Sequence, residues 1–306
     1  MEQQHMFTNR MIRNLLVPVV LEQILNSIMG TADTMMVSNV GSAALSAVSL
    51  VDSINVLLIQ AFSALAAGGA IVCAQYIGQR NYEKANMSAR QVLFIITAIS
   101  VVVSAVCLIF QKPLLRLIFG AVDADVMRAS ETYFFFTALS FPFIAAYDSA
   151  ASIFRAQENT KGPMTISMIS NIMNIGGNAV LIWVFHLGVA GAAISTLVSR
   201  IFCAVVVLWQ LRKDRQPVVV RDYLKIRPDW SMIGRILGLG IPSGIENSMF
   251  QLGKLAIQST VSTLGTAAIA AQAMTNILEN LNGIAAIGVG VGLMTIVGQC
   301  LGAGRT

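Results

Sequence analysis

The chain has 306 residues, of which 56% are hydrophobic and only 11% charged. A soluble domain carries about 25% charged residues, so a protein this apolar lacks the polar surface to fold in water and requires a lipid bilayer. The net charge of +5 would suit nucleic acid, but the basic residues lie in short gaps between apolar segments, as in membrane-protein loops. We therefore expect membrane lipid, and no nucleic acid, as a partner of this chain.

Apolar segments follow one another along the chain, each long enough to cross a bilayer, which takes roughly 20 residues as a helix. They cover residues 14–38, 46–76, 91–111, 131–154, 164–186, 189–211, 236–263 and 267–300. Barrel strands would alternate polar and apolar residues, and these segments do not. Because lipid otherwise admits only helices, the sequence predicts an all-α polytopic membrane protein. The connection from Lys112 to Ser130 has room for a short interfacial helix.

Lysine and arginine are distributed unevenly between the two sets of connections. If the N-terminus is inside, the outer connections carry only Lys112, Arg116 and Arg128, and the other basic loop residues are cytoplasmic. Cytoplasmic loops of membrane proteins are enriched in lysine and arginine. The sequence therefore predicts a multi-pass protein of the plasma membrane with a cytoplasmic N-terminus.

The sequence repeats itself at a constant offset of 224 residues. Without a gap, this register aligns uncommon residues of the first two spans with those of the last two: Pro18 with Pro242, Glu22 with Glu246, Gly41 with Gly265, Gln75 with Gln299, and Gly78 with Gly302. An even number of spans separates the two copies, so both have the same orientation in the membrane. Parallel repeats of this kind form the two halves of transporters, with a central cavity between them.

The repeat divides the chain into three parts. Residues 1–211 are predicted to form an N-terminal six-helix bundle, 212–235 a cytoplasmic linker, and 236–306 the first two helices of a C-terminal bundle. The second copy ends after these two helices. We therefore expect a chain that is truncated after about eight of twelve helices, and we expect transport to need the remainder.

Short motifs occur in order along the spans. They are Pro18, Thr31-Ala32-Asp33-Thr34, Val37, Gly41, Gln75-Tyr76-Ile77-Gly78, Asn171, Asn174, Ile175, Gly191-Ala192-Ala193, Ser195-Thr196 and Gly240-Ile241-Pro242. In this ordered set and in its repeat, the chain resembles the multidrug and toxic compound extrusion (MATE) family over essentially its whole length. The resemblance implies a secondary active antiporter that exports drug-like cationic compounds in exchange for Na⁺ or H⁺, without other cofactors. We expect the full-length protein to be a monomer.

The resemblance also implies a cation-coupling site in the first half. It assigns Asp33 and Asn174 to this site, and it places Asn178 where many members carry an aspartate, which removes one negative charge. An ionised carboxylate at mid-bilayer costs about 2.5–3.5 kcal/mol, so Asp33 needs a proton, a cation or polar partners. The helical spacing of Asn171, Asn174 and Asn178 places them on one face. They would either hold Na⁺ with Asp33 or form hydrogen bonds between helices.

Further polar residues lie within the spans. Glu22 and Asp33 are eleven residues apart and share one face of their helix, with Asn26 near it, so we expect Glu22 to assist cation coupling. Glu246 would attract a cationic substrate, or Lys254 two turns further on would neutralise it. The expected substrate-cavity residues are Glu246, Asn26, Asn171, Lys254 and Glu279. Asp52 and Asp148 are expected near the ends of their spans, where water reaches them.

Two other function classes fit the sequence less well. A flippase for a lipid-linked oligosaccharide or cell-wall precursor is the alternative of related architecture, but it should carry several cavity arginines for phosphate, and only Arg200 is a candidate. An enzyme is not expected. His5 and His186 are isolated, so no metal site or histidine–carboxylate pair is indicated, and the chain has no G-x-x-x-x-G-K-[ST] phosphate loop.

Overall fold

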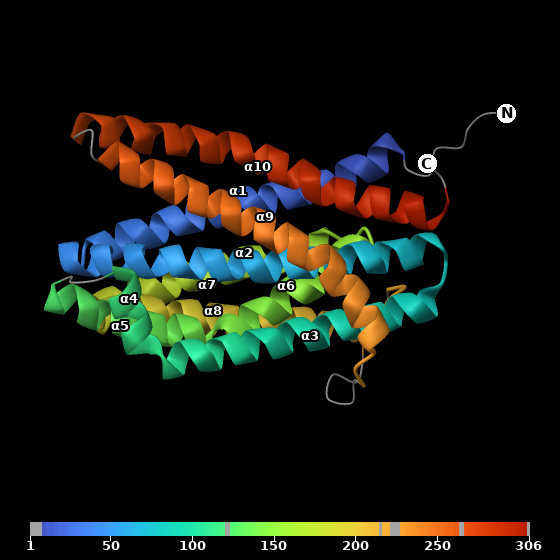
Figure 1. Cartoon of the computed structure of the whole chain (residues 1–306), viewed down its shortest axis with the longest axis horizontal. Coiled ribbons are helices and arrows are strands. Elements are labelled where there is room, and N and C mark those ends of the chain that lie inside the picture. Colours follow the sequence, from blue (N-terminus) through green and yellow to red (C-terminus); the bar gives the residue numbers. More distant parts are fainter. Residues whose placement is uncertain (1–7, 120–122, 214–215, 221–226, 263–265, 305–306) are drawn as a thin grey trace.

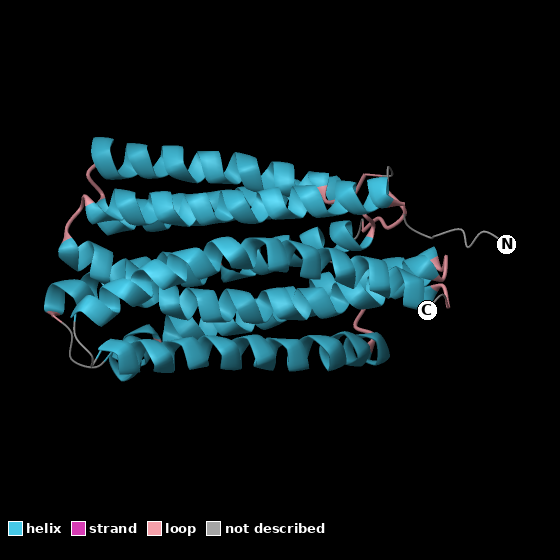
Figure 2. Cartoon of the chain, turned by 90° about the horizontal axis from the view of Figure 1, so that it is seen from above, coloured by secondary structure: helices cyan, strands magenta, loops and turns pink. Residues whose placement is uncertain are grey.

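The computed structural model describes residues 8–119, 123–213, 216–220, 227–262 and 266–304. Helices connected by short loops account for nearly all of these residues, and no strand occurs among them (Figures 1 and 2). The helices are α1 (Asn9–Ser38), α2 (Ser42–Gly78), α3 (Tyr82–Ile109), α4 (Gln111–Phe119), α5 (Ala124–Leu139), α6 (Phe141–Ala156), α7 (Lys161–Asn178), its π-helical continuation (Ala179–Val184), α8 (Gly188–Leu211), α9 (Trp230–Ser262) and α10 (Thr266–Gly302). The prediction of an all-α protein is confirmed.

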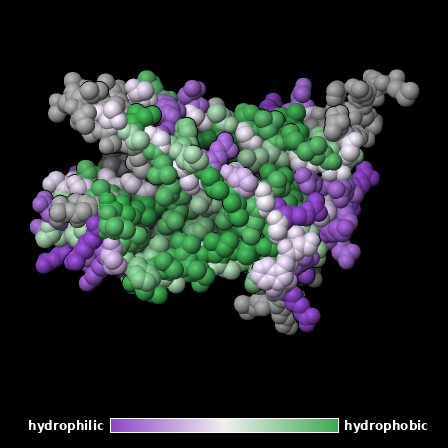
Figure 3. Space-filling model, viewed as in Figure 1, coloured by the Kyte–Doolittle hydropathy of each residue, from purple (hydrophilic) through white to green (hydrophobic). Residues whose placement is uncertain are grey.

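The long helices match the apolar segments of the sequence. By length and composition, six described helices can cross a bilayer, and there are seven if the bent α5–α6 pair is counted as one span. The seventh predicted span, α9, is 33 residues long but is not among them, because Glu246, Asn247 and Gln251 interrupt its apolar sequence. Figure 3 shows a broad apolar surface along the middle of the molecule, with hydrophilic residues gathered toward its two ends.

The fourth predicted span, 131–154, is not one continuous helix. α5 and α6 meet at Ser140 with a bend of 42°. Pro142 lies in the first turn of α6 and has no N–H to donate to the carbonyl of Ala138, four residues earlier. That carbonyl instead accepts a hydrogen bond from Ser104 Oγ of α3, at 2.7 Å. The short helix expected between Lys112 and Ser130 is present as α4.

α9 begins earlier than the sequence predicted, at Trp230 rather than at residue 236. Asp229 explains the difference, because its Oδ1 accepts hydrogen bonds from the backbone N–H groups of Ser231 (3.0 Å) and Met232 (3.2 Å), and thus caps the helix. Before the cap, the connection is attached to the N-terminal bundle. The N–H of Val218 donates to Gln157 Oε1 at 3.0 Å, and that of Val219 donates to Asn86 Oδ1 at 2.7 Å.

Close helix contacts come in pairs related by the offset of 224 residues. Gly240 packs so tightly on α2 that a Cβ at Gly68 would lie 2.6 Å from its nitrogen, and in the second copy a Cβ at Gly292 would meet the Leu16 side chain of α1. Two further pairs of contacts are related in the same way. Gly244 faces Ala64, and their counterparts Val20 and Gly288 face each other. Gly78 contacts Gln299, and their counterparts Gly302 and Gln75 contact each other. A two-fold axis that relates the two copies produces this exchange of partners. The parallel repeat is therefore confirmed, with Gly265 outside the described residues.

The axis passes between α2 and α10 near Ala74. A Cβ at Gly298, its counterpart in the second copy, would lie 3.0 Å from the Ala74 Cβ. Here, at what we call the closed end, α10 is also bonded to the end of α6: Thr295 Oγ1 donates to the carbonyl of Arg155 (3.2 Å), and Gln299 Nε2 to that of Ala156 (2.9 Å). Toward the opposite end, called the open end, the α9–α10 pair diverges from α1 and α2 (Figure 1).

Candidate functional site

Two carboxamides of α7 surround the carboxylate of Asp33. Asn178 Nδ2 donates to Asp33 Oδ1 at 2.5 Å. The side-chain oxygen of Asn174 otherwise faces only acceptors, so its amide is assigned with the nitrogen toward Asp33, 2.7 Å from Oδ1 and 3.3 Å from Oδ2. The structure thus brings together Asp33, Asn174 and Asn178, which are three of the four residues predicted to couple the cation.

The partners of these amides come from α8. Thr196 Oγ1 lies 3.3 Å from the Asn174 amide, and Ser195 Oγ donates to the Asn174 carbonyl at 2.8 Å. α7 and α8 can approach this closely because residue 177 is glycine, where a Cβ would lie 2.5 Å from Ser195 Oγ. Asn178 Oδ1 is buried and has no hydrogen-bond partner. An oxygen that lacks a donor, next to a carboxylate, offers a place for a cation or a proton.

A second polar cluster lies next to Asp33. Asp52 of α2 accepts hydrogen bonds from Tyr133 of α5 and from Asn55, both at 3.2 Å. Arg200 of α8 donates to Ser140 Oγ at 2.7 Å and interacts electrostatically with Asp33, Asp52 and Asp148. The expectation that Asp52 and Asp148 lie at the ends of their spans is wrong. Both lie within helices and are half-buried, next to polar groups of neighbouring helices.

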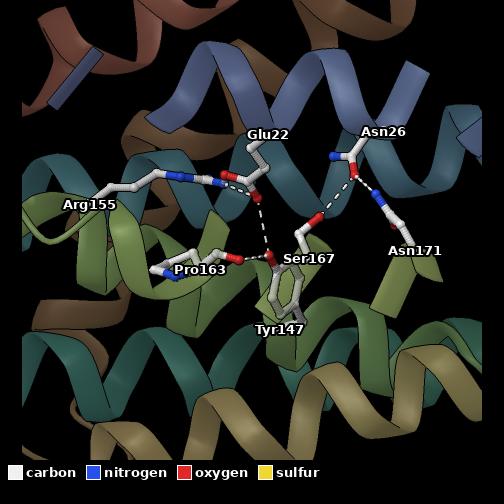
Figure 4. A network of polar contacts seen from close by, with 7 residues as sticks. All are labelled: Glu22, Asn26, Tyr147, Arg155, Pro163, Ser167 and Asn171. Atoms are coloured by element: carbon white, nitrogen blue, oxygen red, sulfur yellow. Dashed lines mark hydrogen bonds and ion pairs between the residues drawn. The ribbon is translucent and has the colours of Figure 1, made fainter. Parts of the chain in front are cut away.

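Glu22 lies in a separate network with Arg155 and Tyr147 (Figure 4). It is 2% exposed, and both of its carboxylate oxygens lie 3.1 Å from Arg155 Nη2. Tyr147 OH lies 3.1 Å from Glu22 Oε1 and 3.2 Å from the Pro163 carbonyl, and it can donate to either. The structure therefore places Glu22 on the same helix as Asp33 but with partners of its own.

Asn26 and Asn171 are bonded to each other across the α1–α7 contact (Figure 4). Asn26 Oδ1 accepts from Ser167 Oγ at 2.9 Å and from Asn171 Nδ2 at 3.1 Å. Of the two roles expected for the asparagines, holding Na⁺ or bonding between helices, Asn171 has the second in this structure.

In the second copy, Lys254 forms an ion pair with Glu279 and not with Glu246. Lys254 Nζ lies 2.8 Å from Glu279 Oε1, with the side chains 38% and 47% exposed, and it also lies over the Phe250 ring at 5.0 Å. Glu246 is exposed on α9. Lys254 thus neutralises Glu279 rather than Glu246, because α10 runs back along α9 and brings Glu279 beside it.

Sequence reasoning named Asp52 without placing it in the site, and it did not identify Asn55, Tyr133, Tyr147 or Arg155 as residues of these networks. Asp52 carried a usable signal, because a charge within an apolar span needs a partner. Arg155 carried a weaker signal, because it ends a span and is equally well placed for a loop. Tyr133, Tyr147 and Asn55 carried none, because such residues are common at helix–helix contacts.

The sequence matches the MatE family model over residues 18–180 and 242–306. The probable multidrug resistance protein YoeA of Bacillus subtilis is 28% identical over 94% of the chain and 63% of its own length. The probable multidrug resistance protein NorM of Thermotoga maritima is 25% identical over 95% of the chain, again with 63% of its own length covered. The chain thus spans about 63% of the length of these curated relatives.

Solved structures show the same fold. A MATE transporter in the bent conformation superposes with a TM-score of 0.88, at 21% identity over 96% of this chain and 65% of that chain. An outward-facing multidrug resistance MATE family transporter gives 0.89 at 20% identity, with the same coverage. The family model matches well over half of the chain, and the protein belongs to the MatE family.

Proposed function

We propose that this chain forms the N-terminal bundle and part of the C-terminal bundle of a secondary active antiporter that exports drug-like organic cations in exchange for Na⁺ or H⁺. The observation that carries the proposal is the contact of the Asp33 carboxylate with the carboxamides of Asn174 and Asn178 inside a helix bundle. Relatives named as multidrug resistance proteins support it.

The charge of Asp33 has to be balanced, and its direct partners are neutral. A cation held by Asp33 with the oxygens of Asn174 and Asn178 would balance it, and so would a proton on the carboxylate. Carboxylate, carboxamide and hydroxyl oxygens are hard ligands that suit Na⁺. Asn178 Oδ1 lacks a donor, so turning it to such an ion would cost only the bond from Asn178 Nδ2 to Asp33, which the ion would replace.

The position of Asp33 suits uptake from one side. Asp33 lies five residues before the end of α1 at Ser38, which is about 8 Å of helix. That end of α1 belongs to the open end of the molecule. With a cytoplasmic N-terminus in the plasma membrane, as the basic residues favour, the open end faces outward, where an inwardly directed ion gradient would load Asp33.

The residues proposed to recognise the substrate line the cavity expected between the two bundles. Glu246 occupies the position in the second copy that Glu22 has in the first, but Glu22 is neutralised by Arg155 and Glu246 is exposed. An exposed carboxylate on a polar stretch of α9 would attract an organic cation. Asn26, Asn171, Lys254 and Glu279 are the further proposed lining residues.

The flippase alternative gains no support from the buried arginines. Arg155 pairs with Glu22, and Arg200 interacts with three aspartates. Neither guanidinium is therefore available to bind a lipid phosphate without first losing a carboxylate partner.

Ethidium efflux from efflux-deficient cells tests the proposal. The cells express the whole gene product that contains residues 1–306, as wild type, Asp33→Asn or Asp123→Asn. We expect Asp33→Asn to abolish ion-driven efflux at equal protein level, because an amide neither takes up a proton nor balances Na⁺. Asp123→Asn is the matched control, since Asp123 lies outside the bundle before α5 and should leave efflux unchanged. Undiminished efflux by Asp33→Asn would contradict the role of Asp33.

The same variants in proteoliposomes separate the two ions. Efflux driven by a Na⁺ gradient at equal pH on both sides would identify Na⁺. Efflux driven only by a pH gradient would identify H⁺.

A further inference from the structure

Asp52 has a carboxamide partner in the same way as Asp33. Asn55 Nδ2 donates to Asp52 Oδ1 at 3.2 Å, and Tyr133 OH donates to the same oxygen at 3.2 Å. Asn55 is only 3% exposed, and its Oδ1 has no hydrogen-bond partner. The structure thus holds two pairs of one kind, Asp33 with Asn178 and Asp52 with Asn55. In each pair a buried amide oxygen lacks a donor.

A proton supplies what each pair lacks. A carboxylate only accepts hydrogen bonds, so it can pair with the N–H₂ of an amide but not with its oxygen. A protonated carboxyl group has an O–H as well, and with a primary amide it forms two hydrogen bonds, one in each direction. Protonation of Asp52 would therefore keep the bond from Asn55 Nδ2 and give Asn55 Oδ1 its missing donor.

The charges around Asp52 also favour uptake of a proton. The charged groups that act on this cluster come from four helices: Asp33 of α1, Asp52 of α2, Asp148 of α6 and Arg200 of α8, with the Tyr133 hydroxyl of α5 among them. Asp148 also interacts with Arg155, which pairs with Glu22, so two guanidiniums face the four carboxylates of Glu22, Asp33, Asp52 and Asp148 inside a lipid-embedded bundle. A coupling ion on Asp33 lowers the excess negative charge by one. If Asp33 is empty and charged, another group has to be neutralised.

A proton fits Asp52 better than a metal cation does. Two donors, Tyr133 OH and Asn55 Nδ2, already point at Asp52 Oδ1, and the nearby Arg200 repels a further cation. The oxygen ligands that Na⁺ would need are therefore not assembled here.

We propose that Asp52 is a second proton-binding site, paired with Asn55 and Tyr133, and that it gains or loses its proton as Asp33 loses or gains its coupling ion. The proposal rests on the proposed coupling role of Asp33. The step is an acid–base exchange: an O–H bond forms on the Asp52 carboxylate with a proton from water, and the same proton returns to water when the bond breaks. Asp52 is partly exposed, which gives water a route to it.

Infrared difference spectroscopy on the purified whole gene product tests this. Spectra at acidic and alkaline pH are subtracted, and isotope-labelled aspartate distinguishes aspartate bands from glutamate bands. We expect separate protonated-carboxyl bands for Asp33 and Asp52, with Asp52→Asn removing one and Asp33→Asn the other. Asn55→Leu removes the amide that bonds the carboxyl group, and should move only the Asp52 band to higher wavenumber. Asn178→Leu should do the same only to the Asp33 band.

Asp148→Asn is the matched control, because it removes a third carboxyl group of the same cluster and should leave the Asn55-sensitive band in place. The proposal is overturned if Asp52→Asn and Asn55→Leu both leave the wild-type spectrum unchanged. That result would not affect the coupling role of Asp33, which the efflux assay tests separately. Conversely, normal efflux by Asp33→Asn would refute the proposed coupling role of Asp33. An Asp52 band in the infrared spectrum would still show that Asp52 binds a proton.

Discussion

Glu22 and Asp33 lie on the same face of α1, but their neighbours differ in charge. Glu22 meets a guanidinium and Asp33 meets two carboxamides. Because Arg155 balances Glu22 within the protein, that carboxylate has no need of an ion from outside. The carboxamides hold Asp33 in place without neutralising it, so a proton or Na⁺ can arrive and leave without breaking an ion pair. We infer that Glu22 fixes α1 and that Asp33 exchanges the ion.

The first stability prediction concerns the Glu22–Arg155 pair. Arg155→Met leaves a buried carboxylate without its counter-charge, which should destabilise the protein by about 3–5 kcal/mol. The double variant Glu22→Gln/Arg155→Met removes both charges and should recover much of that loss. Thermal unfolding in detergent measures both variants.

Arg116→Met serves as the control for this prediction, because Arg116 is exposed on α4 and its loss should change little. A double variant that is as unstable as Arg155→Met alone would mean that the pair acts through packing rather than through charge.

The sequence anticipated the residues of the Asp33 site better than their partners. Helical spacing showed that Glu22 and Asp33 share a face, and the resemblance pointed to Asn174 and Asn178. It did not show that Arg155, more than a hundred residues away, would neutralise Glu22. Such a pairing depends on how α6 packs against α1, and no local pattern records that contact.

At the scale of helices, two prolines each leave a backbone carbonyl without its usual N–H donor, because proline has no N–H. In both cases a hydroxyl group from another helix, or from the loop beside it, donates to that carbonyl instead. Pro142 frees the carbonyl of Ala138, which accepts from Ser104 of α3. Pro18 of α1 frees that of Asn14, which accepts from Thr160 Oγ1 at 3.3 Å. Lipid offers no donor for a freed carbonyl, so a proline inside a membrane helix is favoured where a neighbouring segment supplies one.

The second stability prediction follows from this arrangement. Ser104→Ala should destabilise the protein by about 1–3 kcal/mol, because the buried Ala138 carbonyl loses its hydrogen-bond donor. Ser100→Ala is the matched control on the same helix. Ser100 is also buried, but it bonds the carbonyl of Thr97 within its own helix, which keeps its backbone partner. Thermal unfolding should separate the two variants, and equal losses would show that the Ala138 carbonyl does not depend on Ser104.

These helix-scale details were only partly predictable. Pro142 is visible in the sequence, but prolines are tolerated inside membrane helices, so the apolar segment 131–154 predicted one span. Whether a proline bends a helix depends on its neighbours, here on Ser104. The start of α9 was placed too late because only polarity was used, although the capping residue Asp229 is visible in the sequence.

At the scale of the whole molecule, the repeat found in the sequence becomes a physical contact at the closed end. Gly78 and Gly302 allow α2 and α10 to meet with backbone against backbone, and Gln299 bonds the end of α6. The register of 224 residues predicted that these glycines are equivalent, and the exchange of partners confirms it. The register could not predict that the copies touch at this end and diverge at the other, because one sequence is compatible with either arrangement.

If the two bundles rock against each other during transport, the closed end has to open. Ala74→Cys/Gly298→Cys, in a background without Cys73, Cys107, Cys203 and Cys300, places two thiols on the two-fold axis. The Cβ atoms would start at about the separation that a disulfide needs, after a small shift of the helices. We expect oxidation to cross-link α2 to α10 and to stop ethidium efflux by the whole gene product, and reductant to restore it. Each single cysteine variant should transport under both conditions. Full efflux from the cross-linked protein would mean that α2 and α10 stay together throughout the cycle, and the substrate would then have to pass between other helices.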